Sequence, residues 1–354
     1  MKKTSTRLAD GRELVYYDLR DDTVRDAVDR RPLERTVTTS EVRRDPLLGD
    51  SAPSRLAPQG RTYHPPADQC PLCPSGRGTA ERDPAYDVVV FENRFPSLAG
   101  DSGRCEVVCF TSDHDASFAD LSEEQARLVV DAWTDRTSEL SHLPSVEQVF
   151  CFENRGAEIG VTLGHPHGQI YAYPFTTPRT ALMLRSLAAH KDATGGGNLF
   201  DSVLEEELAG ERVVLEGEHW AAFVAYGAHW PYEVHLYPKR RVPDLLGLDE
   251  AARTEFPKVY LELLRRFDRI FGEGEPPTPY IAAWHQAPFG QLEFEGVTRD
   301  DFALHLNFSL PPYVRQAEVP RGLRIRHERV HQRDVPPERA AERLREVADV
   351  HERE

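Results

Sequence analysis

The sequence predicts an α+β fold in which antiparallel sheets are flanked by helices. Short segments rich in β-branched and aromatic residues recur along the chain, which is typical of strands. Two long segments, one after Ser122 and one after Asp249, carry apolar residues at helical spacing. The order of these segments in the first half is repeated in the second. We therefore infer that the chain holds two copies of one ancestral unit.

The first half of the chain is expected to contribute several short strands. Residues 1 to about 60 are charged and irregular, and we expect them to form an extended arm with one short strand. The expected strands span residues 13–17, 86–91, 106–110, 146–153 and 168–173. The last two are expected to be neighbours, with the glycine-rich residues 156–164 as the loop between them.

Capping residues mark where the helices of this half begin. Ser122 and Gln125 form a capping box that opens a helix ending near Ser141. Thr177 is followed by a proline, which suits the first position of a second helix, and this helix is expected to end near Ala189.

A glycine-rich stretch divides the chain in two. Residues 194–198 break the preceding helix and are the expected linker between a domain of residues 1–193 and a domain of residues 199–354. In the second domain a strand is expected within residues 229–240, and a long amphipathic helix follows Asp249.

The second half also repeats the chemistry of the first half, but incompletely. If His305 corresponds to His165, the residue that corresponds to His167 is Asn307. The second half is therefore expected to lack the second histidine of the pair. Strands are expected at residues 280–285 and 302–310, and they correspond to the strand ending at Glu153 and to the strand that follows His165.

Composition excludes some classes of partner. The 354 residues carry a net charge of −16, which argues against a nucleic-acid backbone as the main partner. No apolar run reaches the ~20 residues of a membrane span, and the first residues lack the hydrophobic region of a signal peptide. We therefore expect a cytoplasmic protein that binds neither nucleic acid nor a membrane. A local cluster of donors can still bind a phosphorylated small molecule despite the acidic surface.

The stretch of residues 163–171 concentrates chemically active side chains. His165, His167, Gln169 and Tyr171 occupy alternate positions, so an extended strand would place them on one face. Gly168 between them is expected to leave bare backbone where a ligand could approach. The alternative, two surface histidines in a polar loop, is less favoured because apolar residues occupy the opposite face.

Cys70 and Cys73 form a Cys-Pro-Leu-Cys knuckle with the spacing of a zinc site. Two more ligands must come from elsewhere, and the candidates are His114 and His165. A redox pair or two incidental cysteines are the alternatives, but the flanking prolines argue against redox chemistry. A site with four protein ligands would be closed and therefore structural.

If His165 binds the metal, the imidazole of His167 is free to act as a base or a nucleophile. Its expected surroundings are glycine and the amides of Gln169 and Asn154, which suit the oxygens of a phosphoryl group. This pattern predicts attack of His167 on a phosphorus atom to give a phosphoramidate, which a second acceptor later cleaves.

Several motifs of the chain resemble those of the galactose-1-phosphate uridylyltransferase family, within the histidine-triad superfamily. They occur in order from about residue 45 to residue 312: Cys-Pro-Leu-Cys73, Phe-Glu-Asn-Arg-Phe-Pro96, Thr-Ser-Asp-His114, Phe-Glu-Asn-Arg-Gly156, His-Pro-His-Gly-Gln-Ile-Tyr171 and Trp-His-Gln-Ala-Pro-Phe289. The resemblance implies a duplicated histidine-triad fold and ping-pong transfer of UMP. UDP-glucose would uridylylate His167, and galactose-1-phosphate would then take the UMP to form UDP-galactose.

The resemblance also implies roles for individual residues and a homodimer. His167 and Gln169 would be catalytic, with Gln169 holding the transferring phosphate. One zinc ion per chain would be bound by Cys70, Cys73, His114 and His165. Substrate contacts are implied for Arg61, Leu72, Asn93, Asn154, Thr162 and Gln169.

The sequence departs from the family pattern at a second metal site. Some members bind a second ion with a carboxylate and three histidines of the second half. Here His285 and His305 match, but Asn307 replaces the third histidine and Met183 lies near the carboxylate position. Amide and thioether groups replace these ligands poorly, so the second site is expected to be weak or absent.

Two further departures concern the substrate contacts. In the family, a strand and two arginines precede the knuckle. Residues 50–61 depart from this pattern, because Pro58 stands at the first arginine position and Arg61 matches the second. A disordered strand and lowered activity are therefore expected. In the tail, residues 321–327 keep a basic character but not the family's lysine-containing sequence, so selectivity for the sugar is not fixed by the motifs.

Two rival functions share part of this pattern. One is a related nucleotidyltransferase or phosphorylase that acts on another nucleoside diphosphate sugar, such as ADP-glucose, or on a dinucleoside polyphosphate. The other is a zinc-stabilised scaffold without enzymatic activity, which would leave His167 unmodified.

Overall fold

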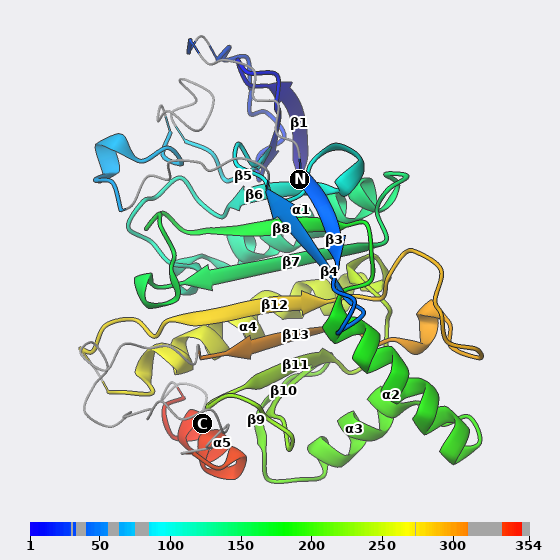
Figure 1. The fold of residues 1–354 in the computed structure, drawn as a ribbon. Coiled ribbons are helices and arrows are strands. Elements are labelled where there is room, and N and C mark those ends of the chain that lie inside the picture. The colour runs from blue at the N-terminus through cyan, green and yellow to red at the C-terminus, as the bar shows by residue number, and fades with distance from the viewer. Residues whose placement is uncertain are drawn as a thin grey trace.

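A computed structural model describes residues 1–29, 31–32, 40–55, 64–74, 85–272, 274–310 and 335–348. Most of the strands in these residues join one 11-stranded sheet, with the order β1-β2-β5-β6-β8-β7-β12-β13-β11-β10-β9 (Figure 1). The strands of the first half are β1 (Lys2–Arg7), β2 (Glu13–Asp18), β5 (Val88–Glu92), β6 (Arg104–Cys109), β7 (Gln148–Arg155) and β8 (His167–Tyr173). Those of the second half are β9 (Val213–Glu216), β10 (Trp220–Val224), β11 (Val234–Pro238), β12 (Tyr280–His285) and β13 (His305–Ser309).

The strand order shows the duplication. β7 and β12 pair in the middle of the sheet, and every neighbouring pair is antiparallel. Outward from this seam, β8, β6 and β5 of the first half mirror β13, β11 and β10 of the second. The predicted α+β fold, a duplicated histidine-triad-like unit with antiparallel strands flanked by helices, is confirmed. The two units share one sheet, and the domain limits at residues 193 and 199 stay a prediction.

Two long helices lie behind the sheet in Figure 1 and build the main core with it. Helix α1 (Glu123–Ser141) and helix α4 (Glu250–Arg269) pack against each other. The ring of Trp133 in α1 meets that of Trp284 in β12 edge-on, with the centroids 6.2 Å apart. The ring of Phe256 in α4 is tilted against Trp284, with the centroids 5.2 Å apart. The core therefore runs continuously beneath both halves.

Smaller elements complete the fold. Helices α2 (Pro178–Thr194) and α3 (Leu199–Leu208) form a separate apolar cluster with β10 and β11, and α5 (Pro337–Glu346) packs on β9 and β10. Short 3-10 helices occur at Ala67–Gln69, Gly100–Ser102, Phe118–Asp120, Ala157–Ile159, Leu245–Gly247 and Arg299–Asp301. None of the helices in the described residues is both long and apolar enough to span a membrane.

Several expectations about the elements were wrong in detail. The strand expected at residues 13–17 is confirmed as β2, which is buried and pairs with β5 inside the main sheet, but the strand β1 before it was not expected. A further hairpin, β3 (Ser40–Arg44) with β4 (Ser51–Arg55), forms its own two-stranded sheet, so residues 51–55 are a strand and not disordered. Pro58 and Arg61 lie outside the described residues, as do residues 321–327.

Two further boundaries, one in each half, also differ from expectation. Helix α2 continues beyond Ala189 to Thr194, where Gly195 takes the left-handed conformation (φ 70°) that ends a helix. The strand expected within residues 229–240 is shorter, because Tyr232 has a positive φ of 53° and breaks the extended backbone before β11.

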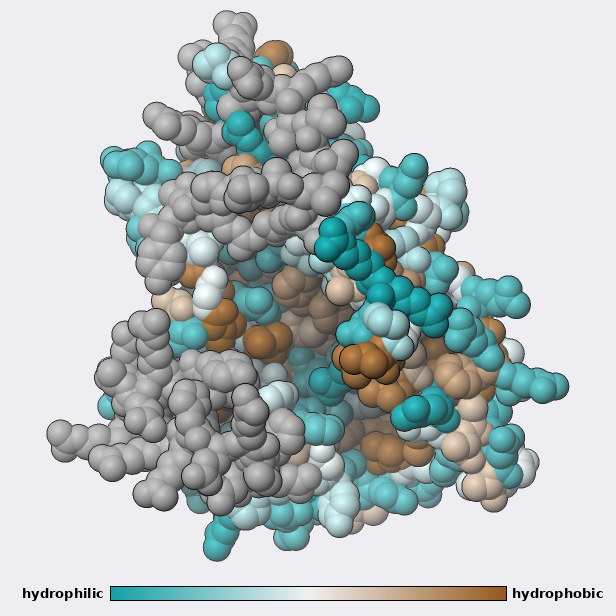
Figure 2. Space-filling model, in the orientation of Figure 1, coloured by the Kyte–Doolittle hydropathy of each residue, from teal (hydrophilic) through white to brown (hydrophobic). Residues whose placement is uncertain are grey.

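The face of the sheet opposite α1 and α4 is hollowed near its centre, where both brown and teal side chains line the depression (Figure 2). β8 presents His167, Gln169 and Tyr171 as half-buried side chains, while its alternate residues are fully buried. The predicted alternation is confirmed for these three residues, whereas His165 lies before the start of β8 and is buried.

Candidate functional site

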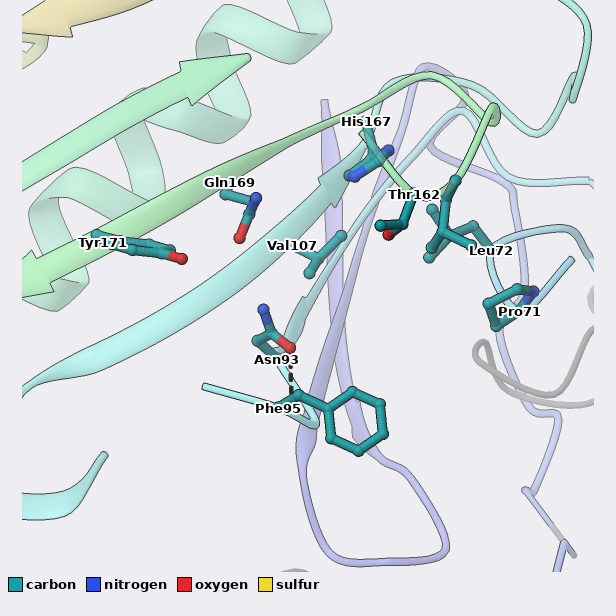
Figure 3. Close-up of a pocket in the computed structure, with 10 residues that line it drawn as sticks. Pro71, Leu72, Asn93, Phe95, Val107, Thr162, His167, Gln169 and Tyr171 are labelled. Carbon is teal, nitrogen blue, oxygen red and sulfur yellow. Dashed lines mark hydrogen bonds between the residues drawn. The ribbon is translucent and has the colours of Figure 1, made fainter. Parts of the chain in front are cut away.

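A pocket opens over β8 and the knuckle that begins at Cys70 (Figure 3). Two strands and three loops contribute to it, which explains why residues far apart in sequence meet there. Its lining consists of Pro71, Leu72, Asn93, Phe95, Val107, Thr162, Leu163, His167, Gln169 and Tyr171.

The hydrogen bond of His167 fixes which ring nitrogen can react. Its Nδ1 lies 2.8 Å from the carbonyl oxygen of His165. A carbonyl oxygen only accepts, so Nδ1 carries the proton and Nε2 keeps a free lone pair. Burial lowers the pKa of His167 below its ordinary value, and the bond to the His165 carbonyl only partly offsets this. The imidazole is therefore neutral near pH 7 and suited to nucleophilic attack through Nε2.

The packing around β8 requires a glycine at position 168. A Cβ atom there would lie 2.8 Å from the carbonyl oxygen of Phe152 and 2.8 Å from the ring of Phe110. The Phe110 ring belongs to the main core, and the Phe152 carbonyl lies on the adjacent strand β7. The glycine therefore lets β8 lie close to the Phe110 ring, and the approach of a ligand to its backbone stays a prediction.

The pocket holds two amide side chains that can face a ligand. Gln169 lies on the same face of β8 as His167, and Asn93 follows β5. The Oδ1 atom of Asn93 accepts the backbone N–H of Phe95 at 2.9 Å, which leaves its amide N–H groups for another acceptor (Figure 3). Donors of this kind suit phosphate oxygens or the carbonyl groups of a base.

The predicted substrate contacts are only partly brought together. Leu72, Asn93, Thr162 and Gln169 line the pocket. Asn154 does not; it lies on β7 opposite Ile281 of β12. The remaining predicted contact, Arg61, lies outside the described residues.

Four candidate metal ligands converge beside the pocket. The ligand atoms of Cys70, Cys73, His114 and His165 all lie within 4.8 Å of one another. Cys73 Sγ is 3.2 Å from His114 Nδ1 and 3.5 Å from His165 Nδ1. Zinc with tetrahedral bonds to one sulfur and one nitrogen requires these atoms to be about 3.5 Å apart.

This donor set fits zinc. Two thiolates and two imidazoles fill a tetrahedron, so the protein alone would complete the coordination. Cys70 and His165 are each only 1% exposed, which suits a closed structural site. The convergence of two histidines on the cysteine pair also favours a metal over the redox alternative.

The sequence matches the models of one protein family along most of its length. Residues 98–177 match the model described as the N-terminal domain of galactose-1-phosphate uridyl transferase, and residues 184–354 match that of its C-terminal domain. A galactose-1-phosphate uridylyltransferase from Thermotoga maritima is 36% identical over 329 residues, covering 87% of this chain and 98% of that protein. The chain belongs to the galactose-1-phosphate uridylyltransferase family.

Another member of this family and two solved structures are also similar to the chain. The Rattus norvegicus galactose-1-phosphate uridylyltransferase is 35% identical over 303 residues, covering 79% of this chain and 77% of that protein. A solved uridylyltransferase structure superposes with a TM-score of 0.69 at 27% identity, covering 86% of this chain and 97% of the other. An ADP-glucose phosphorylase from Arabidopsis thaliana, with a TM-score of 0.65 and 19% identity over 88% of this chain and 99% of that one, shares the fold.

In this family member the second half holds a packed polar cluster. The rings of His285 and His305 stack with centroids 4.9 Å apart, and Tyr237 stacks on the other side of His305 at 4.7 Å. Asn307 donates from Nδ2 to Glu233 Oε1 at 3.2 Å. Partly buried Met183 belongs to the apolar cluster beside them. Within the described ranges, only the group at Cys70 has metal-ligand spacing, and the weakness of a second site stays a prediction.

Sequence reasoning assigned no role to several apolar residues of the pocket lining, among them Phe95 and Val107. Val107 of β6 pairs directly with Gln169, so correct strand pairing would have placed its side chain on the same face. Phe95 lies in the Asn-Arg-Phe-Pro motif, which was recognised only as a likeness. Knowledge of the strand order would have identified Val107, but nothing local marks Phe95.

Proposed function

We propose that the protein transfers UMP from UDP-glucose to galactose-1-phosphate through a covalent intermediate on His167. The products are glucose-1-phosphate and UDP-galactose. The observation that carries the proposal is the His167 imidazole, whose Nδ1 is held by the His165 carbonyl at 2.8 Å while Nε2 is available beside the pocket. Family membership supplies the substrates, because the relatives are named for this reaction.

In the first half-reaction, His167 Nε2 attacks the phosphorus atom that bears uridine. A nitrogen–phosphorus bond forms and the bond from that phosphorus to the bridging oxygen breaks, so glucose-1-phosphate leaves with the electron pair. The imidazole becomes positively charged while Nδ1 keeps its proton. The His165 carbonyl, which accepts that proton's hydrogen bond, stabilises the positive charge.

In the second half-reaction, a phosphate oxygen of galactose-1-phosphate attacks the same phosphorus. The nitrogen–phosphorus bond breaks, and its electron pair returns to Nε2. Gln169 can donate its amide N–H to an oxygen of the moving phosphoryl group in both steps, since it lies on the same strand face as His167. The apolar walls at Phe95 and Val107 would hold the nucleoside.

We propose that Cys70, Cys73, His114 and His165 hold one zinc ion per chain. The ion would supply a rigid link between the knuckle and the strand that carries His167, without contacting the substrate. A second ion at His285 and His305 is not part of the proposal.

The proposal predicts a covalent adduct in the absence of an acceptor. The purified protein is incubated with UDP-glucose alone and its intact mass is measured. We expect a gain of one UMP that is lost in acid and on addition of galactose-1-phosphate. His167→Gly should show no gain. His142→Gly, which replaces an exposed histidine at the end of α1, should behave as the wild type.

The same experiment distinguishes the rival functions. An adduct with ADP-glucose but not with UDP-glucose would replace the proposal with a related phosphorylase or nucleotidyltransferase. The absence of any adduct with either sugar nucleotide or with a dinucleoside polyphosphate would favour the non-enzymatic scaffold.

We also propose that the chain forms a homodimer, on the family resemblance, and acts in the cytoplasm, on the sequence expectation. Sedimentation at micromolar concentration tests the first of these, because a dimer has twice the 40.1 kDa mass of the chain. A monomer that forms the His167 adduct and completes both half-reactions would contradict it.

A further inference from the structure

We propose that Tyr86 is a positioning residue of the zinc site: its hydroxyl links the knuckle to His165 and holds the His165 ring with Nδ1 toward the cysteines. The inference rests on the zinc site of the proposed function. It adds a residue that belongs neither to the ligand set nor to the pocket lining.

The Tyr86 hydroxyl lies between the two parts of the site. Its oxygen is 2.7 Å from the carbonyl oxygen of Leu72, inside the knuckle, and 2.9 Å from His165 Nε2. Tyr86 itself is only 3% exposed and lies two residues before β5. The hydroxyl is therefore held by the sheet and is shielded from water that could replace either bond.

The protons of these hydrogen bonds can be assigned. The Leu72 carbonyl only accepts, so the Tyr86 hydroxyl must donate its single proton there. Towards His165 the Tyr86 oxygen can then only accept, and Nε2 of His165 must donate. A second acceptor, the carbonyl oxygen of Thr111, lies 2.8 Å from the same Nε2. Two acceptors therefore select the tautomer with the proton on Nε2.

That tautomer is the one a metal ion requires. With Nε2 protonated, the lone pair of His165 lies on Nδ1, which is the atom 3.5 Å from Cys73 Sγ. The same hydroxyl that fixes the ring also holds the residue immediately before Cys73. Tyr86 thus sets the position of Cys73, in the knuckle, relative to His165, before β8.

The link continues towards the nucleophile. His165 accepts through its backbone carbonyl from Nδ1 of His167, two residues along. An imidazole ring that is fixed at His165 limits the freedom of this short segment. The geometry points to Tyr86 as a support first for the metal and, through the backbone, for His167.

The test measures the metal directly and not through turnover. Wild type, Tyr86→Phe and Tyr17→Phe are purified with zinc, and release of the ion to a coloured chelator is followed. Partners of metal ligands typically contribute 10- to 100-fold in affinity, so Tyr86→Phe should release zinc roughly 10 to 100 times faster. The cobalt-substituted Tyr86→Phe protein should also show shifted visible bands, because the His165 ligand is less constrained.

Tyr17→Phe is the matched control. Tyr17 is fully buried on the neighbouring strand β2, and its hydroxyl forms a side-chain hydrogen bond of 2.6 Å to Asp135, away from the knuckle. It should lose a comparable hydrogen bond without a change in zinc release or in the cobalt spectrum. Equal acceleration in both variants would mean that Tyr86 acts only through general stability, and would overturn the proposal.

Three other results decide the question. If Tyr86→Phe matches the wild type in zinc release and in its cobalt spectrum, the role of Tyr86 is refuted but the metal site is not. A wild-type protein that takes up no zinc would instead refute the metal site itself. Should Tyr86→Phe not fold, nitrogen-15 NMR of the zinc-loaded wild type still tests the assignment: a proton on Nε2 of His165 is expected, and one on Nδ1 would exclude it.

Discussion

At the scale of single residues, the chemistry of β8 depends on alternation along one strand. His167 and Gln169 are two residues apart and therefore share a face, which could be predicted from the sequence without any knowledge of the fold. The packing reason for Gly168 could not, because its close neighbours are Phe110, directly after β6, and Phe152 of β7. Asn154 was likewise grouped with the site by motif, whereas its position in β7 keeps it out of the pocket lining.

The amide of Gln169 gives the prediction that belongs to this scale. Gln169→Glu keeps the size of the side chain but replaces an N–H donor with a carboxylate, which would repel a phosphoryl oxygen. The loss of one such donor typically lowers a rate about 10²- to 10³-fold. We expect UMP adduct formation from UDP-glucose, measured in a rapid-quench single turnover, to slow by at least this much.

The control for this variant is its zinc content, which should equal that of the wild type because Gln169 is not a metal ligand. Adduct formation at the wild-type rate would show that Gln169 does not contact the transferring phosphate.

At the scale of elements, a buried ion pair fastens helix α1 to β6. Arg136 and Glu106 are 2% and 1% exposed, and the guanidinium donates to both carboxylate oxygens at 2.9 and 2.7 Å. The apolar stripe of α1 could be read from the sequence, but Arg136 interrupts it. Its partner lies 30 residues away, so only the packed structure reveals why a charge is tolerated there.

This pair predicts a large effect on stability. Arg136→Met removes the guanidinium and leaves the Glu106 carboxylate buried, with Arg104 as its one remaining ion-pair partner among the described residues. Breaking a buried pair from one side typically costs about 3–5 kcal/mol. The urea midpoint of Arg136→Met should therefore fall markedly below that of the wild type.

An exposed pair provides the comparison. Arg20 and Asp22 form an ion pair with side chains 78% and 70% exposed. Arg20→Met should shift the urea midpoint little, because water and salt screen the attraction between exposed charges. Similar shifts in the two variants would contradict the account of the α1–β6 contact.

At the scale of the whole molecule, the two copies of the unit meet at the seam between β7 and β12. The duplication could be predicted from the repeated order of elements, but the sequence did not indicate that both copies would share one sheet. A titratable group lies at this seam. Glu153 of β7 is buried, and its Oε2 atom has no hydrogen-bond partner among the described residues.

Burial raises the pKa of Glu153 to about 7, although the positive charge of Arg155 opposes the shift. Asp268 of α4 adds to the rise, and Tyr280 of β12 is also close to the carboxyl group. The folded pKa lies above the unfolded value of 4.5. The contribution of Glu153 to the free energy of unfolding is therefore fully present below pH 4.5. This contribution is lost as the pH rises through 7.

Glu153→Gln should remove this dependence. Relative to the variant, the wild type should lose about 3 kcal/mol of unfolding free energy between pH 4.5 and pH 8, as estimated from the shift in pKa. Urea titrations of both proteins across this range measure the difference. A constant difference at every pH would mean that Glu153 ionises as readily in the fold as in the unfolded chain.

In the proposed reaction, His167 is the residue that carries the transferred UMP. The most direct test is to incubate the protein with UDP-glucose alone, digest it at neutral pH and locate the added UMP by peptide mass spectrometry. The account predicts that the UMP lies on His167 and disappears when galactose-1-phosphate is added before digestion. UMP on any other residue, or turnover without any covalent intermediate, would contradict it.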